Sequence, residues 1–113
     1  MLKIEAVIRT IKLQEVKKEL ERIGIVTFSS FDVRISGLAH EMTSDRKPGS
    51  FKTSALIPKT KIEIICMEKD ADRIIEAIVN GARTGRVGDG IVYVCPISYL
   101  MKIKNGKLND QAV

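Results

Sequence analysis

Apolar and polar side chains follow two different spacings in the N-terminal part of the chain. Residues 2–9 alternate between the two kinds, which predicts a strand. Residues 12–23 instead repeat at helical spacing, with an apolar face made of Leu13, Val16, Leu20 and Ile23. Gly24 suits the turn that ends such a helix. Residues 25–36 are rich in Ile, Val, Phe, Thr and Ser and alternate again, so they predict a second strand.

The pattern stops after this strand. Residues 37–54 contain Gly, Ser, Thr, Asp, Pro and Lys with few apolar positions, and so long a loop in a compact domain is usually functional or disordered. Residues 59–66 then predict a third strand. A second helix is predicted over residues 70–82, with Asp70 as its N-cap and a buried stripe of Ala71, Ile74, Ile75 and Ile78.

A last strand over residues 91–97 and a short polar tail over 98–113 complete the pattern. The order is βαββαβ, which is typical of the α+β class and of the ferredoxin-like fold. That fold predicts an antiparallel sheet with both helices on one face, in a single domain over residues 1–113. The second and third strands carry apolar residues in both alternating sets, so we expect copies of the chain to pack against the other face.

Composition and charge narrow the class of protein. Hydrophobic residues make up 44% and charged residues 29%, as in ordinary globular domains, and no apolar run is long enough to span a bilayer. The N-terminus does not resemble a signal peptide, so we expect a cytoplasmic protein. The net charge is +5, but the charges are dispersed and aromatic residues are only 4%, which argues against nucleic-acid binding. A basic surface that favours anionic ligands is the better interpretation.

The sequence offers little catalytic chemistry. Cys66 and Cys95 lie in apolar runs without CxxC spacing, so we expect reduced, buried core residues and no metal site. His40 is the only histidine, and no nucleophile–base or paired-carboxylate pattern is evident. The chain is therefore expected to have no catalytic residues and not to be an enzyme.

A glycine-rich loop gives the clearest functional indication. Between the second helix and the last strand, residues 84–90 read Thr-Gly-Arg-Val-Gly-Asp-Gly. Glycine lets a ligand approach the backbone closely, and consecutive exposed N–H groups form a concave site for an anion. The loop predicts binding of a phosphorylated ligand, in the first instance a nucleotide.

Three segments together resemble the PII signal-transduction proteins (nitrogen regulatory protein P-II). They are the opening residues 3–9 together with 12–16, the run Ile57–Ile64, and the stretch Ala77–Gly90 that ends in the glycine-rich loop. The resemblance implies a homotrimer that binds ATP or ADP in three clefts between subunits. It also implies that residues 37–56, the T-loop of the family, dock on a regulated enzyme or transporter. Membrane contact is expected only through a transporter partner.

The resemblance assigns nucleotide-binding residues one by one. The phosphate-binding loop over residues 83–90 is matched by Thr84, Gly85, Arg86, Gly88, Asp89 and Gly90. The residues matched elsewhere in the cleft are Ser29, Gly37, Lys59, Glu63, Ile64, Lys102 and Lys104. Of these, Lys102 and Lys104 stand in place of two family arginines. The positive charge is kept, but the pair of parallel hydrogen bonds that a guanidinium donates to one phosphate is lost.

Departures from the family pattern change the expected ligands. Ile91 stands where the family has a basic residue on the phosphates, so we expect ADP or AMP to bind about as well as ATP. Ala39 replaces the glutamine that holds Mg²⁺, and Leu38 replaces a nearby arginine. The resemblance implies that many members bind 2-oxoglutarate through this Mg²⁺. Because Ala39 cannot ligate a hard cation, Mg²⁺ and 2-oxoglutarate are doubtful ligands of this chain.

The T-loop also departs from the pattern. Lys52 takes the place of the tyrosine that some members carry nucleotidylated, so that modification is not expected. Ser50 aligns with a serine phosphorylated in some members, although a serine in a polar loop is usually only a loop residue. Partner contacts are expected from Arg46, Lys47, Ser50, Phe51 and Lys52.

Two alternatives remain open. One is a nitrogenase-associated PII regulator, because the loops of that branch also depart from the standard signature. The other is a trimeric interaction module with no working nucleotide site.

Overall fold

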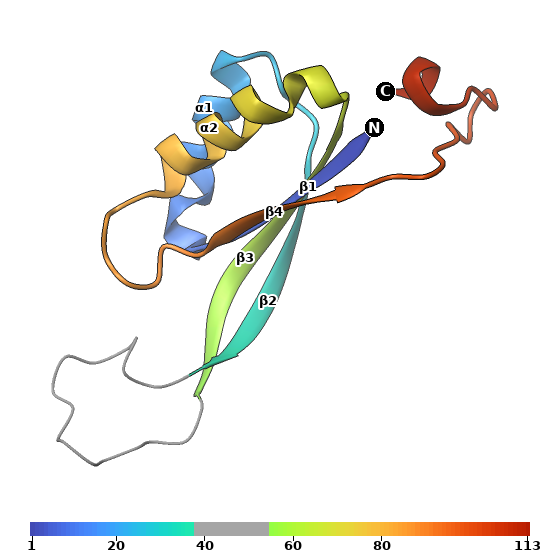
Figure 1. The fold of residues 1–113 in the computed structure, drawn as a ribbon. Coiled ribbons are helices and arrows are strands. Elements are labelled where there is room, and N and C mark those ends of the chain that lie inside the picture. Colours follow the sequence, from blue (N-terminus) through green and yellow to red (C-terminus); the bar gives the residue numbers. More distant parts are fainter. Residues whose placement is uncertain (38–54) are drawn as a thin grey trace, which may run out of the picture.

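The computed structural model describes residues 1–37 and 55–113, which form one four-stranded antiparallel sheet with two helices on one side (Figure 1). The main elements are, in chain order, β1 (Leu2–Ile8), α1 (Leu13–Arg22), β2 (Ser29–Gly37), β3 (Ala55–Cys66), α2 (Ala71–Ala82) and β4 (Ile91–Pro96). The strand order is β2-β3-β1-β4. The predicted ferredoxin-like βαββαβ fold is confirmed.

The core lies between the helices and one face of the sheet. Alternate residues of β1, namely Ile4, Ala6 and Ile8, are buried against the helices, and the register pairs Ile4 with Ile64 and Ala6 with Ile62. The predicted helical faces are confirmed: Val16 and Leu20 of α1 and Ala71, Ile74 and Ile78 of α2 are buried, while Leu13, Ile23 and Ile75 pack at the edge of the core.

A short left-handed turn ends α1 as predicted. Gly24 has a φ of 87°, which a side chain would disfavour. Its N–H donates to the carbonyl oxygen of Glu21 (3.0 Å), and the N–H of Ile25 donates to that of Leu20 (2.9 Å). The N–H of Ile25 is therefore committed to the helix end, and the second strand starts only at Ser29 rather than at residue 25.

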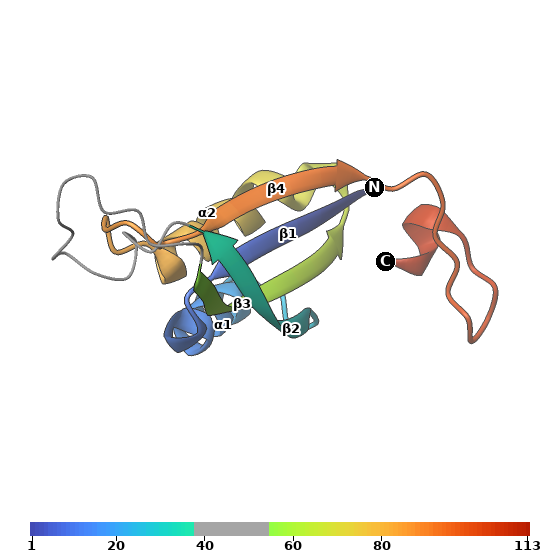
Figure 2. The same ribbon diagram turned by 90° about the horizontal axis from the view of Figure 1, so that it is seen from below.

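Two other expectations differ from the structure. Asp70 precedes α2 but makes no capping hydrogen bond, because its carboxylate accepts hydrogen bonds from Arg73 (3.2 and 3.3 Å). The tail is not simply polar and irregular: Met101 pairs with Leu108 in an isolated antiparallel bridge, and Asn109–Ala112 forms a 3-10 helix. Figure 2 shows that this tail extends away from the sheet beyond the end of β4.

The sheet face away from the helices has a charged centre with apolar ends. Lys61 on β3 lies 3.2 Å from the carboxylates of both Glu5 and Glu63, and Lys3 lies 3.5 Å from Glu5. Burial raises the pKa of Glu5, but its hydrogen bond with Lys61 and the nearby positive charges outweigh burial and lower that pKa overall. The exposed apolar side chains on this face are Phe31, Ile35, Ile65, Ile91 and Tyr93.

The two cysteines have different environments. Cys66 is buried in the core as predicted, and burial raises the pKa of its thiol. Cys95 is only half-buried, because it lies opposite Lys3 on the open face with its Sγ 3.9 Å from Glu5. No helix among the described residues is long and apolar enough to cross a membrane.

Candidate functional site

The glycine-rich loop is organised around the carboxylate of Asp89. One oxygen accepts hydrogen bonds from the backbone N–H groups of Thr84 (2.9 Å) and Gly85 (2.8 Å), and the other accepts one from the Thr84 hydroxyl (2.6 Å). These bonds, together with Arg9, hold the pKa of Asp89 well below its usual range. Hydrogen bonds between Asp89 and residues 84 and 85 therefore fix the conformation of the loop.

Arg9, which sequence reasoning missed, fastens the loop to the end of β1. Its Nη1 forms an ion pair with Asp89 and donates to the Thr84 hydroxyl (3.1 Å), while its Nη2 donates to the carbonyl oxygen of Val87 (2.7 Å). No local pattern could have revealed this residue, because Arg9 and Asp89 are 80 positions apart in the chain.

The backbone of the loop leaves donors available for an anion. The N–H groups of Val87 and Gly88 have no hydrogen-bond partner within residues 1–37 and 55–113. Gly88 has a φ of 101°, and the Nζ of Lys59 donates to its carbonyl oxygen (2.7 Å). Lys59 thus places a positive charge beside these N–H groups, which is the arrangement that binds phosphate.

Gly90 is required by close packing. It has a φ of 103°, and a Cβ added to it would overlap the carbonyl oxygen of Val7 on the neighbouring strand. Only glycine allows the loop to enter β4 this close to β1.

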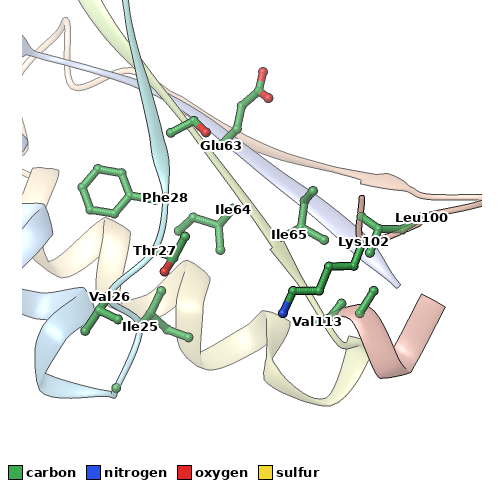
Figure 3. A pocket seen from close by; sticks show the side chains of 13 residues that line it. Ile25, Val26, Thr27, Phe28, Glu63, Ile64, Ile65, Leu100, Lys102 and Val113 are labelled. Atoms are coloured by element: carbon green, nitrogen blue, oxygen red, sulfur yellow. The ribbon is translucent and has the colours of Figure 1, made fainter. Parts of the chain in front are cut away.

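A second group of predicted residues lines a cavity of about 550 Å³ at the opposite end of β3. Ser29, Glu63 and Ile64 lie in its wall, and Lys102 comes from the C-terminal tail. Figure 3 shows Lys102 and Val113 on one side of this cavity, with Ile25 and Thr27 on the other side and Ile64 between them. Sequence reasoning missed the segment 24–28, which also lines this cavity and lies outside the sheet because β2 begins only at Ser29.

The edge of β3 is uncovered beside this cavity. β2 begins at Ser29, opposite Glu63, so residues 64–66 have β1 on one side and no strand on the other. Alternate residues of an antiparallel strand direct their N–H and C=O groups to opposite sides. This edge therefore presents backbone donors and acceptors beside the cavity.

The predicted site residues thus fall into two separate groups within one chain. The phosphate wall consists of the loop over residues 83–90 with Lys59, and the base wall consists of Ser29, Glu63, Ile64 and Lys102. The cavities beside the two walls share no residue. On β3, Lys61 lies between Lys59 and Glu63 and forms ion pairs with Glu63 and with Glu5 of β1.

The remaining predicted residues line neither cavity. Arg86 and Lys104 are exposed, although the N–H of Arg86 donates to the Thr84 hydroxyl (3.1 Å). Gly37 ends β2 opposite Ala55. The expected T-loop positions Leu38, Ala39, Arg46, Lys47, Ser50, Phe51 and Lys52 lie outside the described residues.

Comparisons with known proteins agree with one another. The sequence profile of the family described as nitrogen regulatory protein P-II matches residues 1–107. The chain is 37% identical to the nitrogen regulatory protein P-II of Microchaete diplosiphon over the full length of both. It is 35% identical to nitrogen regulatory protein P-II 2 of Methanothermobacter thermautotrophicus, over all of this chain and 97% of that one. A crystal structure of Arabidopsis thaliana PII bound to citrate superposes with a TM-score of 0.79 at 29% identity, covering 99% of this chain and 91% of that one.

Proposed function

The chain belongs to the nitrogen regulatory protein P-II family, and we propose that it is a homotrimeric signalling regulator that binds an adenine nucleotide in clefts between its subunits. The observation that carries the proposal is the separation of the site into two walls. Each wall is incomplete in one chain, and a cleft in which the base wall of one subunit meets the phosphate wall of the next would unite them.

The chemistry of each wall fits its part of an adenine nucleotide. Adenine presents an amino donor beside a ring-nitrogen acceptor, which the uncovered backbone edge of residues 64–66 can pair. The N–H groups of Val87 and Gly88, which have no partner among residues 1–37 and 55–113, and the ammonium of Lys59 suit a phosphate. Lys102 would bring a second positive charge from the other subunit.

The open sheet face supports the homotrimer. Apolar side chains such as Phe31, Ile65 and Tyr93 are exposed there in the single chain, and contact between subunits would bury them. Native mass spectrometry tests this directly, with a trimer as the expected species and a monomer as the result against it.

Signalling would pass through residues 37–56 to a target enzyme or transporter. A bound nucleotide changes such a segment only by favouring one of its conformations over another. The proposed role is regulatory and not enzymatic. Binding of the target through this segment is testable by pull-down with the full chain and with a variant that lacks residues 40–52.

Subunit mixing is the sharpest test of the shared cleft. Lys59→Glu should remove nucleotide binding through the phosphate wall, and Ser29→Trp should remove it through the base wall, with Ser29→Thr as a matched control that still binds. Unfolding and refolding the two defective variants together should restore about one cleft in four, because each intact wall can then meet the other. Titration calorimetry measures the restored sites.

The outcomes separate the possibilities. Restored binding in the mixture requires a cleft built from two chains. If the mixture stays inactive while wild type binds, the site lies within one chain. If wild type binds no nucleotide at all, the chain is an interaction module without a working nucleotide site.

A further inference from the structure

A small apolar cavity lies directly beside the phosphate wall. It has a volume of about 280 Å³ and is lined by Val7, Ile35, Lys59, Gly88, Gly90 and Ile91. Three of these residues are aliphatic, and Lys59 is the only charged one among them. Ile91 is 61% exposed and Ile35 is 40% exposed. Their side chains therefore form the surface next to the glycine-rich loop that a bound ligand would contact.

The positive charge available at this wall is small. Arg9 is already paired with Asp89, so its charge is largely compensated. Arg86 is exposed and does not line the cavity. Lys59 and the N–H groups of Val87 and Gly88 remain, and they can surround one phosphate group.

Further phosphates would find no polar partner in this cavity. A phosphate placed against Ile91 and Val7 would lose water without gaining hydrogen bonds, which is costly for a charged group. A magnesium ion would not compensate, because it needs oxygen ligands. Asp89, the carboxylate of the loop, is occupied by Thr84, Gly85 and Arg9.

We propose that this site selects a nucleoside monophosphate over the triphosphate and binds it without a divalent cation. The inference rests on the proposed nucleotide-binding function and names the ligand class of that site. The two charges of a monophosphate match Lys59 of one subunit and Lys102 of the next, and the aliphatic residues contact the less polar ribose.

Calorimetric titration of the full chain with AMP, ADP and ATP, each with and without Mg²⁺, tests the inference. AMP should bind at least as tightly as ATP, and Mg²⁺ should tighten the binding of none of the three. Ile91→Lys should tighten ATP binding by about tenfold or more, as one charge-assisted hydrogen bond would, and should change AMP binding less than threefold. Ile91→Val is the matched control, and the exposure of this position makes both variants compatible with folding, which circular dichroism verifies.

Three results would overturn the inference. ATP binding tenfold tighter than AMP in wild type would refute it while leaving the proposed function intact. Equal tightening of AMP and ATP by Ile91→Lys would show that the position does not discriminate phosphate number. Absence of binding by any of the nucleotides would remove both the inference and the proposed nucleotide site.

Discussion

The two faces of the sheet are made by alternating residues of the same strands, and they differ in almost every physical respect. On the covered face, β1 and β3 contribute Ile4, Ile8 and Ile62, all buried by the helices. On the open face the intervening positions of the same strands hold Glu5 and Lys61. One face stabilises the fold of a single chain, whereas the other leaves apolar side chains such as Phe31 and Tyr93 exposed.

Core truncation should show the largest difference between the faces. Ile62 is fully buried and Ile65, three positions later on the open face, is 44% exposed. Ile62→Ala should lower the free energy of unfolding by about 2–5 kcal/mol, because it leaves a cavity under the helices. Ile65→Ala should cost about 1 kcal/mol or less in the dissociated subunit. Urea denaturation at low protein concentration measures both, and equal losses would contradict the comparison.

The next largest effect is expected where the open face meets the loop. Gly90→Ala would force a Cβ into the carbonyl oxygen of Val7, so the loop must move away from β1 and nucleotide affinity should fall more than tenfold. Gly85→Ala is the matched control. It also has a positive φ (84°) but open space around it, so backbone strain of about 1–2 kcal/mol is the only cost. Similar binding by the two variants would show that the close approach at Gly90 is not needed.

Acid should weaken the ion pair between Glu5 and Lys61 on the open face. Because the folded pKa of Glu5 is lowered, its pairing with Lys61 contributes stability above the unfolded pKa of about 4.3, and this contribution is lost as pH falls through that value toward the folded pKa. Wild type should therefore lose stability between pH 6 and 3 more steeply than Glu5→Gln does. Urea midpoints measured across this range give the slopes, and Glu21→Gln on the exposed surface of α1 serves as control. Parallel slopes for wild type and Glu5→Gln would contradict the assignment.

The smallest effect is expected from the ring beside this ion cluster. The ammonium of Lys61 lies 5.4 Å from the centre of the Phe31 ring. Phe31→Leu removes that cation–π contact and should lower the urea midpoint of the dissociated subunit by less than Glu5→Gln does at pH 7. Phe31→Tyr keeps an aromatic ring and should match wild type. A loss with Phe31→Leu that exceeds the loss with Glu5→Gln would reverse this order.

Most of the fold could be predicted from the sequence, because spacing reports which side of an element faces the core. The helical stripe through Val16 and Leu20 and the alternation of Ile4, Ala6 and Ile8 each record a local geometry. The start of β2 could not be predicted, because residues 25–28 have strand-like composition while the N–H of Ile25 is bound by the end of α1.

The candidate site was only partly predictable for a related reason. The glycines at 88 and 90 are visible in the sequence because a positive φ demands them. The internal role of Asp89 depends on Arg9, a partner far away in the chain, and no spacing rule reports such a pair. The separation of Lys59 from Lys102 likewise follows from the topology of the sheet and not from either residue.

The ion pair between Arg9 and Asp89 also determines when the glycine-rich loop can fold during synthesis of the chain. β1 is the first strand to leave the ribosome, yet it lies between β3 and β4, and its last neighbour is also the last strand made. The 80 residues between Arg9 and Asp89 take roughly 4 to 16 seconds to add at about 5–20 residues per second. Throughout that interval the nascent chain contains Arg9 but not Asp89, so the ion pair that fixes the loop can form only after Asp89 has been added.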